Sequence, residues 1–156
     1  MNYIESFDRY ELFQDSSAAS GDDFFRHMGR FFADPAIRKE LGGPMSDSER
    51  HVWLMARSMD TGEIVAFSGV RFSVDRRVAW FTETWVSPDH RNNGLFERLF
   101  TLKYDMCFAA GARTVYGMAN PISAAMFERH GWQVASQRGQ WSHYEKHVRV
   151  EQGQEE

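Results

Sequence analysis

The sequence predicts an α/β fold in which a central mixed sheet of about six to seven strands is flanked by about four helices. Three observations support this prediction. Apolar residues recur with helical spacing in four separate stretches, three consecutive β-rich stretches are separated by short turns, and strands alternate with helices in the remainder. Of the 156 residues, 42% are hydrophobic, which is enough for the core of one domain.

The N-terminal part predicts one strand followed by two helices. The pattern between residues 1 and 20 favours one short strand. From Asp22 onward the apolar residues follow helical spacing. A second helix is predicted over residues 35–41 and should end at Gly42, because glycine readily adopts the left-handed conformation found after a helix.

The middle of the chain predicts an antiparallel meander. Residues 51–59, 63–74 and 78–86 are rich in β-branched and aromatic side chains, as is typical of strands. The segments 60–62 and 75–77 between them have turn composition. Consecutive strands should therefore pair as hairpins.

The remaining elements alternate in type. They are a helix over 93–110, a strand over 113–118, a helix over 120–130 and a final hairpin over 132–137 and 140–148. We expect residues 1–148 to form a single domain and the polar residues 149–156 to be a disordered tail.

Charge and composition exclude several function classes. The formal charge of −4 argues against a surface that grips nucleic acid and suits a cationic substrate. No apolar run is long enough to cross a bilayer and no signal-peptide pattern is present, so we expect a cytoplasmic protein. The single cysteine, Cys107, excludes an internal disulfide, and the histidines show no metal-ligand spacing.

The segment from Val86 to Phe96 predicts a strand, a turn and the start of a helix. Pro88 ends the strand, and an apolar helix follows near Gly94. Backbone amides at the free N-terminus of that helix would attract an anion such as pyrophosphate, and Arg91 would add positive charge. On composition alone, a plain polar loop before a helix explains the segment equally well.

The same segment resembles the acetyl-coenzyme A signature of the GNAT superfamily of N-acetyltransferases. That signature is Gln or Arg, two residues, Gly, one residue, and Gly or Ala; here it covers 91–96, with Phe96 at the last position. Residues 120–132 resemble the second cofactor element of the family, a helix that begins at Asn and ends at Gly followed by an aromatic residue. The likeness extends over roughly residues 3–148 and implies the GNAT fold.

This resemblance implies an N-acyltransferase that moves an acetyl or related acyl group from acyl-coenzyme A to a primary amine, by direct attack in a ternary complex. Acetyl-coenzyme A is the implied co-substrate, and no metal is expected. The implied cofactor-binding residues are Trp85, Val86, Arg91, Asn92, Asn93, Gly94, Leu95, Phe96, Asn120, Ser123 and Phe127.

The catalytic candidates lie on the strand before the signature. Glu83 is the candidate base, because the resembling pattern Glu-x-x-Val often places a carboxylate toward the acceptor. Strict alternation would separate Glu83 from Val86, so this role requires a bulge. A surface carboxylate paired across strands is the competing interpretation. Thr84 is a weaker candidate that would orient a water. Phe127 occupies the position at which members of the family often have a tyrosine that acts as the general acid.

The sequence leaves three functions open. The first is acyl transfer to a small-molecule or peptide amine. The second is a nucleic-acid-modifying acyltransferase of phage type. It is less favoured than the first, because the arginines are dispersed and form no basic stripe. The third is a non-catalytic acyl-coenzyme A binder, motivated by Phe96 and Phe127. Membrane contact is not expected, and the resemblance also allows a homodimer.

Overall fold

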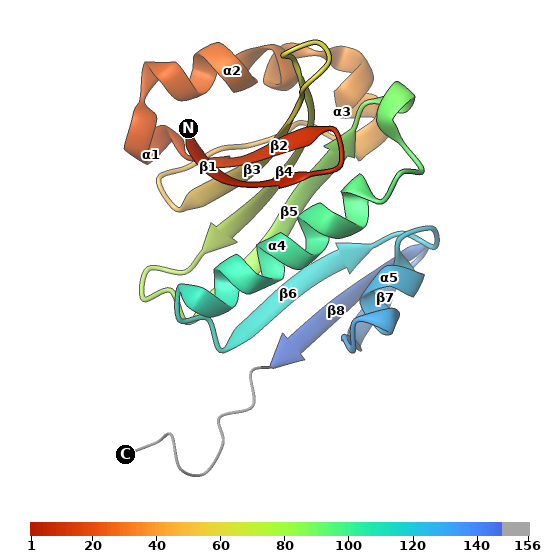
Figure 1. Cartoon of the computed structure of the whole chain (residues 1–156). Coiled ribbons are helices and arrows are strands. Elements are labelled where there is room, and N and C mark those ends of the chain that lie inside the picture. Colours follow the sequence, from red (N-terminus) through yellow and green to blue (C-terminus); the bar gives the residue numbers. More distant parts are fainter. Residues whose placement is uncertain (148–156) are drawn as a thin grey trace. The chain divides into compact units, whose positions relative to one another are not determined.

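A computed structural model describes residues 1–147 of the chain, which form eight strands and five α-helices (Figure 1). The strands are β1 (Asn2–Phe7), β2 (Tyr10–Asp15), β3 (His51–Ser58), β4 (Ile64–Phe72), β5 (Val78–Val86), β6 (Thr114–Ala119), β7 (Gln133–Arg138) and β8 (Trp141–His147). The helices are α1 (Ser17–Ser20), α2 (Asp22–Ala33), α3 (Pro35–Leu41), α4 (Leu95–Ala109) and α5 (Ala124–Arg129), with a 3-10 turn, η1 (Pro88–His90).

The strands form one mixed sheet in the order β1-β2-β3-β4-β5-β6-β8-β7. Strands β1 to β4 pair antiparallel in succession, and β8 pairs antiparallel with both β6 and β7. Strand β5 lies between β4 and β6 and is parallel to β6 over Val78–Trp80. This arrangement confirms the predicted α/β fold with a mixed sheet.

The chain divides into two compact units. The first comprises Met1–Arg71 and Thr82–Lys103, and the second comprises Phe72–Phe81 and the described residues from Tyr104 onward. Strand β5 and helix α4 therefore contribute residues to both. The expectation of one domain over residues 1–148 stays a prediction, and the tail over 149–156 lies outside the described residues.

In the first unit, the N-terminal stretch is a hairpin and not the single strand that the sequence predicts. Strands β1 and β2 pair antiparallel, and Phe7 lies opposite Tyr10. The turn between them contains Asp8 with φ of 51°, a left-handed conformation that aspartate tolerates better than most residues. This turn lacks glycine, so the usual hairpin signal is missing from the sequence.

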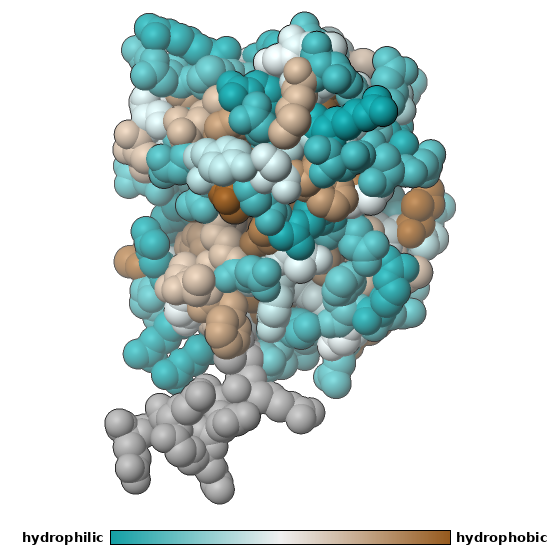
Figure 2. Space-filling view, viewed as in Figure 1, coloured by the Kyte–Doolittle hydropathy of each residue, from teal (hydrophilic) through white to brown (hydrophobic). Residues whose placement is uncertain are grey.

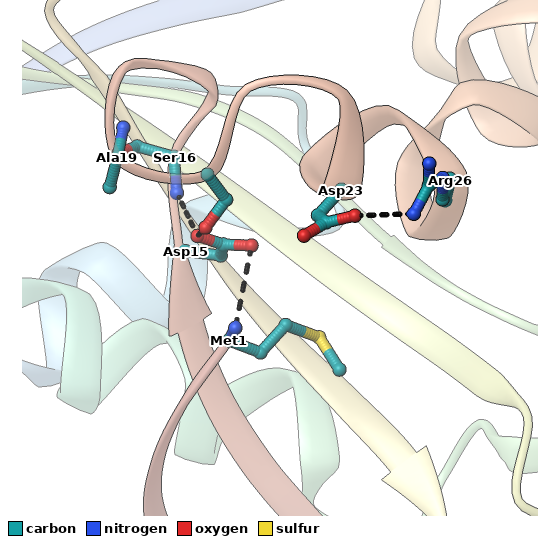
Figure 3. Close-up of polar contacts among 7 residues, drawn as sticks. Met1, Asp15, Ser16, Ala19, Asp23 and Arg26 are labelled. Atoms are coloured by element: carbon teal, nitrogen blue, oxygen red, sulfur yellow. Dashed lines mark hydrogen bonds and ion pairs between the residues drawn. The ribbon is translucent and has the colours of Figure 1, made fainter.

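Short polar contacts organise the chain after the hairpin (Figure 3). The Ser16 hydroxyl accepts from the amide of Ala19 at 3.1 Å and thereby caps α1, a helix that the sequence pattern did not predict. The amide of Ser16 in turn donates to the Asp15 carboxylate at 2.8 Å. Within α2, Arg26 pairs with Asp23 one turn earlier, at 2.7 Å.

The core of the first unit forms between α2 and the sheet. The helix buries Phe24, Met28 and Phe31, as its apolar spacing predicts. These side chains pack with Trp53 and Phe67 on the strands. Aromatic side chains share this core with methionine and isoleucine, and together they fill the space between helix and sheet.

The second unit is built on the parallel pairing of β5 and β6. Strand β8 pairs antiparallel with β6, and β7 forms the edge. Helix α5 begins at Ala124 and not at Asn120, because residues 121–123 form a turn first.

The surface carries mostly hydrophilic residues on the face shown in Figure 2, with hydrophobic residues in separate patches between them.

Within residues 1–147, no helix has both the length and the apolar character that crossing a bilayer requires.

Candidate functional site

The turn between β5 and α4 has the backbone conformation of a tight loop. Two of its residues have positive φ, 65° for Asn92 and 86° for Gly94. Asparagine and glycine accept this region more readily than other residues, which explains their use here. The chain therefore reverses direction over a few residues and enters α4 at Leu95.

The amides of this turn are available to an anion. The amide of Leu95 donates to the side-chain oxygen of Asn93 at 3.2 Å. Across residues 1–147, the amides of Asn92, Gly94 and Phe96 donate to no protein acceptor. Unpaired amides at a helix N-terminus, together with the helix dipole, favour a phosphate group.

The N-terminal hairpin holds the turn in place. The Asn93 amide donates from Nδ2 to the Tyr10 hydroxyl at 2.6 Å, and that hydroxyl lies 2.8 Å from His90 Nδ1. Tyr10 is buried, with 4% of its surface exposed. A side chain on Gly94 would meet Phe7 Cζ at 3.6 Å, so β1 also lies beside the turn.

Arg91 is directed toward protein groups. Its Nε donates to the Val86 carbonyl oxygen at 2.8 Å, and its Nη2 forms an ion pair with Glu40 of α3. The sequence predicts that the positive charge of Arg91 attracts an anionic ligand. In the structure this charge is partly neutralised by the Glu40 carboxylate. The pairing also fixes the turn against the end of β5.

A cleft of about 200 Å³ lies at the end of β5 in the first unit. It is lined by Glu40, Leu41, Thr84, Trp85, Val86, Arg91 and Phe96. The structure therefore brings together five residues that the sequence assigns to the site. Phe96, the irregular residue of the signature, is half-buried and belongs to the wall of this cleft.

Thr84 and Trp85 face opposite sides of the sheet. The Trp85 ring stacks on Phe67 in the aromatic core, with centroids 5.6 Å apart. The Thr84 hydroxyl lies 2.6 Å from the hydroxyl of Ser68 on β4. Because its ring is held in the core, Trp85 has mainly its backbone to offer to the cleft.

Side-chain alternation is broken in β5 between Thr82 and Trp85. A Cβ atom on Gly69 would lie 2.4 Å from Thr82 Oγ1 and 2.8 Å from the Trp53 ring, so Thr82 lies on the side of Trp53. Trp85 lies on that same side, through Phe67. Residues three apart in a regular strand face opposite ways, so the strand is irregular where the Glu83 prediction requires it.

Glu83 lies near His51, and it is absent from the described residues that line the cleft. Its Oε2 atom is buried and has no hydrogen-bond partner among residues 1–147. Burial lowers the pKa of His51, whereas the charges of Asp47 and Glu83 oppose that shift. His51 lies 2.6 Å from the Ser48 hydroxyl and stacks on Trp53. The base role of Glu83 stays a prediction.

The remaining predicted site residues belong to the second unit. Asn120 accepts at its side-chain oxygen from the amides of Ile122 and Ser123, at 3.0 and 2.9 Å, and so stabilises the turn before α5. Phe127 is buried and stacks on Tyr144, with ring centroids 5.0 Å apart. Burial is the main cause that raises the pKa of Tyr144, followed by its hydrogen bond to Glu128.

Sequence reasoning missed one buried charge beside the cleft. Lys103 of α4 is 1% exposed, and its Nζ donates to the Gly69 carbonyl oxygen at 3.1 Å and to Thr84 Oγ1 at 3.3 Å. The signal was present, because Leu95, Leu99 and Lys103 follow one another at four-residue intervals on the buried side of the helix.

Comparisons with known proteins agree with this fold. A profile of the Acetyltransferase (GNAT) family matches residues 9–132. The GNAT domain of S. lividans PAT is similar over 89% of this chain and 90% of that chain, with 14% identity and a TM-score of 0.65. Escherichia coli ElaA is similar over 88% and 99%, with 13% identity and a TM-score of 0.65.

A third similar structure contains the expected ligand. The PaiA N-acetyltransferase from Thermoplasma acidophilum, solved in complex with coenzyme A, is similar over 89% of this chain and 99% of that chain. Its identity is 10% and its TM-score is 0.59. No curated protein matches the chain. These structural likenesses show the fold, and the profile covers well over half of the residues. The chain belongs to the GNAT acetyltransferase family.

Proposed function

We propose that the protein is an N-acyltransferase that moves an acetyl or related acyl group from acyl-coenzyme A to a primary amine. One observation carries the proposal: the turn amides of Asn92, Gly94 and Phe96, which have no acceptor among residues 1–147, adjoin a cleft lined by the end of β5. The amides suit the pyrophosphate of coenzyme A. The cleft suits the narrower arm that bears the thioester. Acyl-coenzyme A supplies an activated acyl group when bound.

The end of β5 would then position the acyl group. The amides of Trp85 and Val86 are the groups we assign to polarising the thioester carbonyl, because both residues line the cleft. The Arg91 side chain holds the carbonyl oxygen of Val86 and so restrains the backbone at this point. Restraint of this kind favours a preorganised site.

Glu83 is our proposed proton acceptor for the attacking amine. Support comes from its buried Oε2, which has no hydrogen-bond partner among the described residues and so leaves an acceptor site unused by the protein. The backbone is irregular between Thr82 and Trp85, so the Glu83 side chain need not point to the face of the sheet that strict alternation would give it. The formal net charge of −4 suits a positively charged substrate, so we propose a cationic amine as the acceptor.

A non-catalytic acyl-coenzyme A binder is the second candidate. Two observations favour it. Glu83 is not among the described cleft-lining residues, and Phe127 has no hydroxyl proton to donate at a position where the family often has a tyrosine. Dependence on acetyl-coenzyme A in particular, the cytoplasmic location, the homodimer and a nucleic-acid acceptor remain predictions.

Binding and turnover separate the two candidates. Acetyl-coenzyme A is titrated into the protein by calorimetry, and release of free thiol is then followed with a panel of small amines, polyamines, peptides and nucleic acids. Binding with amine-dependent thiol release supports the transferase. Binding without turnover on any acceptor supports the binder, and absence of binding contradicts both.

The base is tested with Glu83→Gln against a matched control, Glu63→Gln, which alters an exposed carboxylate before β4. We expect Glu83→Gln to lower the rate by about 100-fold near neutral pH and to recover part of it at high pH, where the amine is already deprotonated. The control should behave like the parent. Equal rates for Glu83→Gln and the parent at both pH values would exclude this role.

A further inference from the structure

A buried polar cluster lies behind the cleft in the first unit. It consists of Ser68 and Gly69 on β4, Thr84 on β5 and Lys103 on α4. Ser68 and Lys103 are 0% and 1% exposed, whereas Thr84 is half-buried and also lines the cleft. The cluster therefore connects a buried lysine to the cleft through one hydroxyl group.

Counting donors and acceptors orients the Thr84 hydroxyl. In its ammonium form Lys103 only donates, so Thr84 Oγ1 accepts from it at 3.3 Å. The pair of hydroxyls at Ser68 and Thr84, 2.6 Å apart, shares one further hydrogen bond. If Thr84 donated to Ser68, the Ser68 proton would find no other acceptor among the described residues, inside a fully buried site. Donation from Ser68 to Thr84 avoids that cost.

This orientation leaves the Thr84 proton directed away from both buried partners. Thr84 is half-buried and lines the cleft, so solvent or a ligand in the cleft is the acceptor that we assign to this proton. In its ammonium form Lys103 would polarise the hydroxyl, and water would screen this charge little because Lys103 is 1% exposed. The cleft wall thus carries a polarised hydrogen-bond donor.

We propose that Thr84 donates this hydrogen bond to the sulfur of bound coenzyme A, with Lys103 and Ser68 as positioning residues. The inference rests on the proposed function. When the amine nitrogen bonds to the acyl carbon, the carbon–sulfur bond breaks and its electron pair remains on sulfur. The amine proton passes to Glu83, and the thiolate is stabilised in place by the Thr84 hydroxyl. No tyrosine acid is needed for this step, which accounts for Phe127.

The test measures the thiol pKa of bound coenzyme A, which requires no acceptor. Coenzyme A labelled with ¹³C at the carbon next to sulfur is bound to the protein, and its chemical shift is followed against pH. For the parent we expect a thiol pKa about one unit below that of free coenzyme A, a roughly tenfold gain in thiolate. Thr84→Val should abolish most of this shift, and Thr84→Ser should retain it.

Lys103→Met and Thr82→Val complete the set. Lys103→Met removes the ammonium with little change in length and should raise the bound thiol pKa toward the value in Thr84→Val. Thr82→Val is the matched control, because the buried Thr82 hydroxyl has no hydrogen-bond partner among residues 1–147. It should leave the thiol pKa at the parent value.

The outcomes are distinct. A bound thiol pKa that is the same in the parent, Thr84→Val and Lys103→Met would overturn the inference while leaving coenzyme A binding intact. Failure of the parent to bind coenzyme A would overturn the proposed function and, with it, this inference. If Lys103→Met does not fold, the comparison of Thr84→Val with Thr84→Ser decides.

Discussion

The Nε atom of Arg91 donates to the carbonyl oxygen of Val86 at 2.8 Å, so the first residue of the signature is bonded to the last residue of β5. The same guanidinium pairs with Glu40. One side chain therefore restrains the backbone beside the cleft while its charge is partly neutralised by a carboxylate. An anionic ligand at the turn would meet that carboxylate as well as the arginine.

Glu40→Gln should strengthen coenzyme A binding. Removing the carboxylate leaves the Arg91 charge available to phosphate, and an exposed pair of this kind corresponds to about a two- to fivefold change in Kd. Calorimetry at low and high salt measures the gain, which should shrink as salt screens the charges. Glu49→Gln, at another exposed carboxylate, is the control and should not change Kd. Weaker binding by Glu40→Gln would argue against this account of Arg91.

Gly94→Ala should weaken coenzyme A binding and also destabilise the fold. The positive φ of 86° is unfavourable for alanine by roughly 1–2 kcal/mol of unfolding free energy. Crowding adds little, because the nearest atom would be Phe7 Cζ at 3.6 Å. Chemical denaturation and calorimetry measure the two effects. Gly29→Ala, within α2 and with open space around it, should instead stabilise the protein slightly.

Gly117→Ala should destabilise the protein through Phe127. The new Cβ atom would lie 2.4 Å from Phe127 Cε1, in a ring that is already stacked on Tyr144. Overpacking of this kind costs about 1–3 kcal/mol, measurable by urea denaturation. The double variant Gly117→Ala/Phe127→Leu should lose less stability than the two single variants added together. Simple additivity would show that the two positions are not coupled.

Stability should fall as pH is lowered through the range of His51. Burial lowers the pKa of His51 in the folded protein, whereas the unfolded chain binds its proton near pH 6.5. Below that pH the unfolded state binds more protons, so the free energy of unfolding decreases as pH falls and is fully restored above it. Thermal melts from pH 5 to 8 should show a smaller pH dependence for His51→Gln.

The control for this measurement is His27→Gln, which alters an exposed histidine on α2. It should melt with the pH dependence of the parent. A parent-like pH dependence for His51→Gln would show that another group is responsible.

Periodicity and end signals predicted most of the fold. The sequence correctly placed helices α2 and α3 and strands β3 to β5. Two of their boundaries are marked by glycines with positive φ: Gly42 follows α3, and Gly62 lies in the turn between β3 and β4. The hairpin before them escaped prediction because its turn at Asp8 has no glycine. Local pattern is informative only where the local backbone has a strong preference.

The local geometry of the candidate site was predictable where it depends on neighbouring residues and not where it depends on distant ones. The turn amides follow from consecutive positions along the chain. The pairing of Arg91 with Glu40, 51 residues apart, and the contact of Lys103 with Thr84, 19 residues apart, depend on tertiary packing. Lys103 carried a spacing signal, but its partners could not be assigned without the sheet.

The turn between β5 and α4 depends on the N-terminal hairpin for its position, so it is not a self-contained loop. Besides the Tyr10 hydrogen bonds, Glu5 binds Arg98 of α4 through two bonds of 2.6 Å, and Phe7 lies beside Gly94. Glu5 and Phe7 precede residue 9, where the family profile begins to match. A chain trimmed to the profile would keep the whole signature yet lose two of its supports. Grafts and minimal versions of this protein therefore need residues that the family pattern does not include.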